Sequence, residues 1–61
     1  MDLEKIIGMS DIEAIRLLVK HGIKHRISSY NRKGLMLTRD FVPERVNLEV
    51  VDSRVVRFTK G

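Results

Sequence analysis

The first clear pattern in the chain is an amphipathic segment that follows Ser10. Its apolar positions recur at three- and four-residue spacing, which is typical of a helix with one apolar stripe: Ile12, Ile15, Leu18 and Val19. Ser10 followed by Glu13 forms the capping-box pattern, and Gly22 can adopt the left-handed conformation that ends a helix. The pattern predicts a helix over residues 11–21. An apolar arm that can fold over the helix start precedes it: Leu3, Ile6 and Ile7.

A second pattern, strict alternation, covers residues 45–51. One set of alternate positions is apolar and the other is polar: Val46, Leu48 and Val50 against Arg45, Asn47 and Glu49. Such alternation is typical of a strand with one buried face. Residues 23–30 are a weaker strand candidate that is followed by a turn at 31–34. A tight turn at 52–53 and a last short strand over 54–59 complete the predicted sheet.

The segment between the two main strands, residues 34–44, has one proline and no helical period. It is long enough to connect two parallel strands, and loops of this length without secondary structure are usually functional. Because several of its positions are apolar, we expect an ordered, extended and exposed loop. The predicted fold class is α+β, a single domain over residues 1–61 with one helix packed on a small mixed sheet and an extended exposed loop between two parallel strands.

Composition narrows the function classes. The chain has 61 residues and no cysteine, which excludes a second domain, disulfides, a thiolate nucleophile and a cysteine-based zinc site. Twelve Lys and Arg against eight Asp and Glu give a net charge of +4, so anionic partners are worth considering. No apolar run is long enough for a membrane span or a secretory signal. We therefore expect a cytoplasmic protein without a membrane partner.

The loop and the strand after it resemble the reactive-site segment of the potato inhibitor I family, which includes chymotrypsin inhibitor 2 and eglin. The resemblance rests on Thr38-Arg39-Asp40-Phe41 followed by Pro43-Glu44-Arg45-Val46-Asn47-Leu48. Pro43 and Asn47 are closer to the bacterial and fungal peptidase-inhibitor relatives. The helix start at Gly8-Met9-Ser10-Asp11-Ile12-Glu13-Ala14 and the glycine at Gly61 are also similar to the family. The resemblance extends from about Leu3 to Gly61.

The resemblance implies a serine protease inhibitor that presents an extended loop to the protease like a substrate. The reactive loop would be Leu37, Thr38, Arg39, Asp40, Phe41 and Val42. Arg39 would enter the primary specificity pocket, and the Arg39–Asp40 bond would face the nucleophile. An arginine there implies a trypsin-like or subtilisin-like target whose pocket carries an acid. A monomer without cofactor or metal is expected.

The same resemblance implies that side chains of the following strand support the loop. Arg45 is expected to reach back to Asp40. Asn47 stands where plant members carry a second arginine that supports the threonine, here Thr38. Because asparagine is shorter and neutral, it would have to act through a water. The alternative for Asp40 and Arg45 is an ordinary surface ion pair.

The residues also bear on two other functions. Catalysis is not expected: Ser28, His25 and Asp40 have no surrounding catalytic motif, and His21 and His25 have no carboxylate spacing for a metal. The rival hypothesis is an intracellular binding protein on the same fold, which sequesters an anionic ligand such as a nucleotide or assembles as an oligomer. Its anion contacts would come from this set: Arg26, Arg32, Lys33 and Arg39. Nucleic acid is the less favoured partner because no aromatic ladder accompanies these charges.

Overall fold

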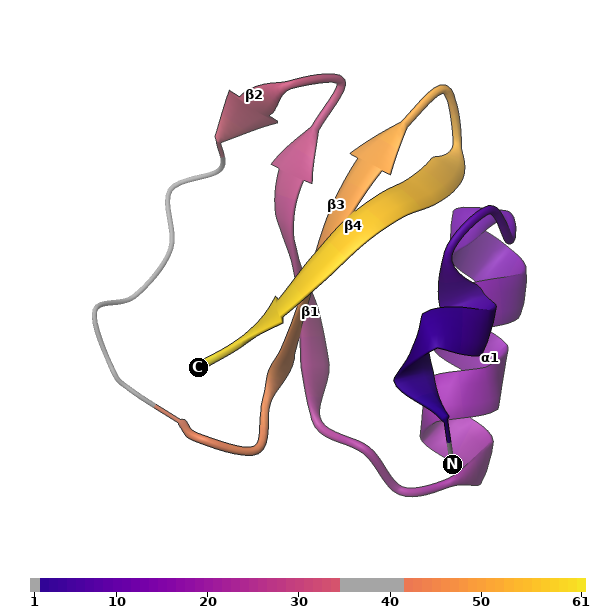
Figure 1. The fold of residues 1–61 in the computed structure, drawn as a ribbon, viewed down its shortest axis with the longest axis vertical. Helices are drawn as coiled ribbons and strands as arrows, with labels where there is room; N and C mark the ends of the chain where they lie inside the picture. Colours follow the sequence, from indigo (N-terminus) through magenta and orange to yellow (C-terminus); the bar gives the residue numbers. More distant parts are fainter. Residues whose placement is uncertain (1, 35–41) are drawn as a thin grey trace.

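The computed structural model describes residues 2–34 and 42–61 (Figure 1). The two helical elements are the 3-10 helix η1 (Leu3–Ile6) and the α-helix α1 (Asp11–Lys20). The strands are β1 (His25–Tyr30), β2 (Lys33–Gly34), β3 (Val46–Val51) and β4 (Arg54–Lys60). In this described part of the chain, no helix is long and apolar enough to cross a membrane.

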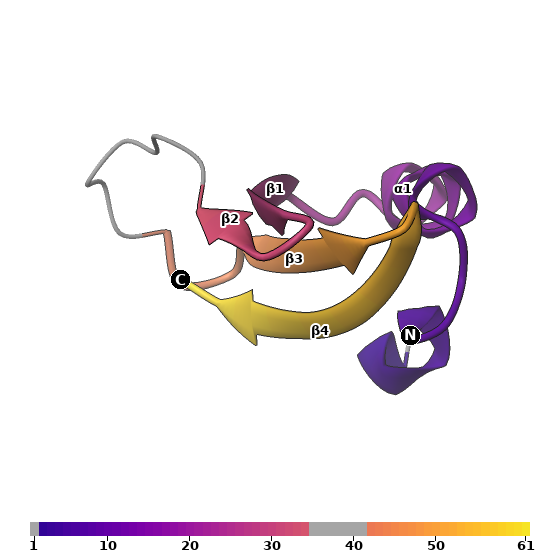
Figure 2. The same ribbon diagram turned by 90° about the horizontal axis from the view of Figure 1, so that it is seen from above.

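The strands form one mixed sheet in the order β2-β1-β3-β4. β1 runs parallel to β3, whereas the β1–β2 and β3–β4 pairs are antiparallel. Both helical elements lie on the same side of this sheet (Figure 2). The predicted α+β class, with one α-helix on a small mixed sheet that contains a parallel pair, is therefore confirmed. The predicted extended loop falls mostly on residues 35–41, which lie outside the described residues.

The core lies between the helices and the sheet. Its members are fully buried and come from η1, α1, β3 and β4: Ile6, Ala14, Leu18, Val46, Leu48, Val50 and Val55. The alternation predicted for the main strand is confirmed, because its apolar set forms the centre of this core.

The apolar stripe predicted for the helix is only partly correct. Leu18 is buried and Ile15 is half-buried, but Ile12 and Val19 are 61% and 63% exposed. The helix instead turns Ala14 and Leu18, one turn apart, toward the sheet. The small side chain of Ala14 permits a close approach to the strands. The helical spacing of apolar residues alone could not predict that this alanine is more buried than the larger Ile12.

The ends of α1 follow the sequence signals closely. The Ser10 hydroxyl accepts a hydrogen bond from the Glu13 amide at 3.2 Å, and the helix ends at Lys20, one residue before the predicted end. Gly22 has a φ of +65°, the left-handed conformation expected of it. The apolar arm before the helix includes η1, in which Ile6 is buried. Ile7 follows the end of η1 and is exposed.

The two hairpin turns at one end of the sheet contain no glycine. Asn31 and Arg32 have φ values of +50° and +68°, and Asp52 and Ser53 have values of +50° and +62°. Two-residue hairpin turns of this left-handed kind usually contain glycine, because other residues are strained there. A hydrogen bond of 2.9 Å from the Asp52 amide to the Asn31 side-chain oxygen joins the two turns.

The N-terminal segment is tied to the last strand. The Gly8 amide donates to the Val55 carbonyl at 2.8 Å, and the Val55 amide donates to the Met9 carbonyl at 2.9 Å. The Asp11 amide, at the start of α1, donates to the Ser53 carbonyl at 2.9 Å. These bonds cover the outer edge of β4 near its start, which would otherwise leave backbone groups unpaired.

Candidate functional site

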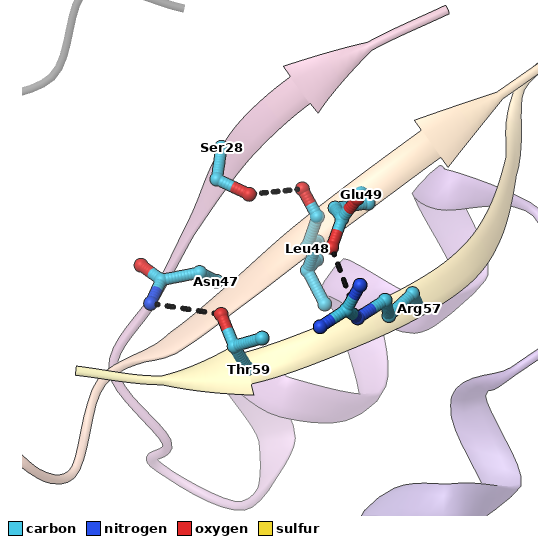
Figure 3. A network of polar contacts seen from close by, with 6 residues as sticks. All are labelled: Ser28, Asn47, Leu48, Glu49, Arg57 and Thr59. Atoms are coloured by element: carbon cyan, nitrogen blue, oxygen red, sulfur yellow. Dashed lines mark hydrogen bonds and ion pairs between the residues drawn. The ribbon is translucent and has the colours of Figure 1, made fainter. Parts of the chain in front are cut away.

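The start of β3 carries a polar cluster that we call the Asn47 network: Arg26, Arg45, Asn47, Thr59 and Gly61. Asn47 is only 7% exposed, although it lies on the sheet face opposite the core. Its side-chain oxygen accepts a bond of 2.7 Å from the Arg26 Nε. Its side-chain nitrogen donates to the Thr59 hydroxyl at 3.4 Å and to the Gly61 main-chain oxygen at 3.0 Å. Figure 3 shows the contact between Asn47 and Thr59.

The sheet register explains why these side chains meet. Arg26 on β1, Asn47 on β3 and Thr59 on β4 are direct neighbours across the three strands. Side chains at paired positions lie on the same face of a sheet, so a row of three polar residues results. A buried amide needs this many partners, because each unsatisfied polar group would cost about 1–3 kcal/mol.

Arg45 and Gly61 close the network at the end of the sheet. The Gly61 amide donates to the Arg45 carbonyl at 2.9 Å, and the Arg45 Nη2 donates to the Gly61 main-chain oxygen at 3.3 Å. The Gly61 oxygen therefore accepts from both Arg45 and Asn47. The start of β3 and the residue after β4 are fixed to each other through main-chain and side-chain bonds.

The residues expected to form the reactive site divide into two groups. Five of them lie outside the described residues: Leu37, Thr38, Arg39, Asp40 and Phe41. Val42 is described and half-buried, and its carbonyl accepts from the Arg45 amide at 3.0 Å in the turn that leads into β3. The two residues expected to support the loop, Arg45 and Asn47, lie together in the Asn47 network. Their expected contacts with Asp40 and Thr38 fall outside the described residues.

Arg26 and Thr59 were not predicted as part of this site. The sequence indicates Arg26 only as an anion contact, whereas its Nε donates a hydrogen bond of 2.7 Å to the Asn47 side-chain oxygen. Neither residue carries a local sequence signal. Only the register of the three strands brings them beside Asn47. In a hairpin the turn fixes the register, but the parallel strands β1 and β3 are not joined by a hairpin turn, so their register cannot be predicted in this way.

A second polar row crosses the same sheet face further along β3. The Arg57 Nε lies 3.4 Å from a Glu49 carboxylate oxygen, and the Ser28 hydroxyl donates to the Leu48 carbonyl at 3.3 Å (Figure 3). Arg57 is 69% exposed and Glu49 is 33% exposed, so their ion pair contributes about 0–1 kcal/mol. In the part of the chain that the structure describes, no three His, Asp or Glu side chains lie close enough together to bind a metal ion.

The chain was compared with protein-family models, with curated proteins and with solved structures, and no match was found in any of the three comparisons.

Proposed function

We propose that this chain is a serine protease inhibitor that presents residues Leu37–Val42 as a substrate-like loop, with Arg39 as the primary specificity residue. The proposal starts from the motif between Thr38 and Leu48. The single observation that supports it best is the Asn47 network, in which the start of β3 is bonded to Gly61 through both Arg45 and Asn47.

The physical argument is preorganisation. A substrate-like peptide loses conformational freedom on binding, at a cost of about 0.5–1.5 kcal/mol for each immobilised side chain. A loop whose ends are already fixed loses less. Gly34 is paired in the sheet before residues 35–41, and the turn at 42–45 leads directly into the buried start of β3 after them. Both ends of the proposed loop therefore leave from ordered backbone.

The charge of Arg39 sets the class of target. A guanidinium in an apolar pocket leaves a desolvated charge, whereas a pocket with a carboxylate allows a charge-assisted pair. The target is therefore a trypsin-like protease, or a subtilisin-like protease that accepts basic residues. In this arrangement the Arg39–Asp40 bond faces the nucleophile of the protease, and the inhibitor acts as a monomer without a cofactor.

The test is a titration of trypsin and of a subtilisin with the purified chain, in which residual activity on a chromogenic substrate is measured. We expect inhibition by the intact chain at micromolar concentration or below and a loss of trypsin inhibition in Arg39→Ala. Arg16→Ala is the matched control, because Arg16 lies on the exposed side of α1. Absence of inhibition by the intact chain would refute the proposal.

The rival function, binding of an anionic ligand such as a nucleotide or assembly as an oligomer, has one observation in its favour. Arg32 and Lys33 are adjacent and exposed at the turn between β1 and β2. Native mass spectrometry in the presence and absence of a nucleotide separates the two hypotheses. A monomer without bound nucleotide favours the inhibitor, and a ligand-bound oligomer favours the rival.

A further inference from the structure

A bulge in β4 exposes an apolar side chain on the sheet face away from α1. Arg57 pairs with Glu49 and Val55 pairs with Val50, so Val56 is an extra residue in β4. Val55 is fully buried in the core, whereas Val56 is 49% exposed. A bulge often changes the direction in which a side chain points, and bulges are common next to functional sites. Here the bulge brings Val56 to the same hollow as Val51 of β3.

This hollow has a volume of about 180 Å³ and is lined by Ser29, Arg32, Glu49, Val51 and Val56. Two of these lining residues are apolar valines, and the other three are a serine, an arginine and a glutamate. A cavity of about 150 Å³ is enough to hold benzene. The hollow therefore has room for one ring or one branched aliphatic group.

Arg32 is held beside the hollow in a strained conformation. Its φ is +68°, in the second position of the two-residue turn between Tyr30 and Lys33. Glycine is the common residue there, because a side chain is strained in this region. The Arg32 guanidinium is exposed and forms no hydrogen bond or ion pair among residues 2–34 and 42–61. Backbone strain that no described contact of the side chain offsets is typical of functional sites.

The charges around the hollow favour a single negative charge on the ligand. Glu49 is paired with Arg57 at 3.4 Å, so its own charge is largely compensated. Arg32, Arg57 and Glu49 together carry a net charge of +1. A carboxylate suits Arg32, because two parallel N–H···O bonds match its planar fork.

We propose that this hollow binds a carboxylate that carries an apolar group of about the size of a benzene ring. The apolar group lies against Val51 and Val56, and the carboxylate pairs with Arg32. The ligand is either a small free acid or the C-terminal residue of a peptide, since both present the same chemistry. This site is independent of protease inhibition and lies on different residues.

The experiment is a titration of the ¹⁵N-labelled chain followed by amide chemical shifts. Benzoate is the small acid, benzamide is its neutral counterpart, and Gly-Gly-Phe with a free or amidated C-terminus represents a peptide. We expect benzoate to bind in the millimolar range and to shift the amides of Ser29, Val51 and Val56. Benzamide should bind about tenfold more weakly, because it lacks the charge. Stronger binding of the free tripeptide than of benzoate assigns the site to peptide termini, and the reverse assigns it to small acids.

Two substitutions to glycine separate an effect on ligand binding from an effect on stability. Arg32→Gly should raise the thermal unfolding midpoint by relieving strain and should weaken benzoate binding at least about tenfold. Ser53→Gly is the matched control: Ser53 has a φ of +62° in the other hairpin turn and does not line the hollow. It should raise the midpoint similarly and change binding less than about twofold. Glu49→Gln should strengthen binding, because it removes the negative charge beside the carboxylate.

The proposal is overturned if benzoate causes no shift at about 20 mM, if benzamide binds equally well, or if Arg32→Gly binds benzoate as the unchanged chain does. Shifts confined to residues away from the hollow would overturn it as well. None of these outcomes depends on protease inhibition.

Discussion

The Nε atom of Arg26 on β1 donates a hydrogen bond of 2.7 Å to the side-chain oxygen of Asn47 on β3. The two residues are paired in the parallel register but are 21 positions apart in the chain. A charged donor on a buried amide forms one of the stronger classes of hydrogen bond. This contact joins β1, which precedes residues 35–41 in the sequence, to β3, which follows them.

Replacing Asn47 should therefore destabilise the fold. Asn47→Ala removes three hydrogen bonds and leaves the Arg26 Nε without this acceptor, for which we expect a loss of about 2–3 kcal/mol in the free energy of unfolding. Urea denaturation measures it. In a double-mutant cycle, Arg26→Ala and Asn47→Ala should show a coupling of at least about 0.5 kcal/mol. Strict additivity of the two substitutions would contradict the importance of their contact.

The orientation of α1 can be tested with two neighbouring residues. Leu18 is fully buried and Val19 is 63% exposed. Leu18→Ala should cost about 2–5 kcal/mol, which is a large part of the stability of about 3–9 kcal/mol expected for a chain of this size. Val19→Ala should change the free energy of unfolding by no more than about 0.5 kcal/mol. Similar losses in both variants would mean that the helix presents a different face to the sheet.

Arg45 should separate an inhibitor from an ordinary substrate. Arg45→Met keeps most of the apolar stem but loses the hydrogen bond to Gly61, so the loop end is held less firmly. We expect trypsin to cleave this variant at least about tenfold faster than the unchanged chain. Mass spectrometry of the incubated mixture gives the rate and the cleaved bond. Arg57→Met is the control, since Arg57 is 69% exposed and belongs to the neighbouring polar row, which does not include Gly61. Equal cleavage of both variants would argue against a supporting role of Arg45.

The identity of residue 39 should determine which protease is inhibited. Arg39→Phe replaces a guanidinium with an apolar ring, which leaves the acid of a trypsin-type pocket unpaired. We expect inhibition of trypsin to fall at least about 100-fold and inhibition of chymotrypsin to appear. Inhibition constants of both proteases for both chains provide the measurement. Unchanged selectivity would exclude Arg39 as the specificity residue.

Local signals were sufficient for most elements of the fold. Ser10, Glu13 and Gly22 predicted both ends of α1 to within one residue, because capping and left-handed ends depend on neighbouring backbone atoms. Alternation identified β3, because its two faces differ in polarity. The short strand β2 at Lys33–Gly34 was predicted as part of a turn, since two residues carry no periodicity.

The rotation of α1 and the composition of the Asn47 network could not be obtained in the same way. The helix has apolar side chains around much of its circumference, so its buried side depends on where Ala14 permits close packing. Arg26 and Thr59 become partners of Asn47 only through strand register, which a parallel connection leaves undetermined. The left-handed Arg32 gave no signal at all, because its turn lacks the usual glycine.

The bonds between the N-terminal segment and the last hairpin have a consequence for synthesis on the ribosome. Gly8 and Met9 pair with Val55, Asp11 pairs with Ser53, and the Arg54 guanidinium donates to the Gly8 carbonyl at 2.8 Å across 46 positions. The first turn of α1 has its own local bonds, but the segment before it acquires these long-range bonds only once the last strand is present. Since non-local pairing is slow to form, a nascent chain that stops before Ser53 should stay unfolded, and the whole domain should fold in one step after those residues emerge.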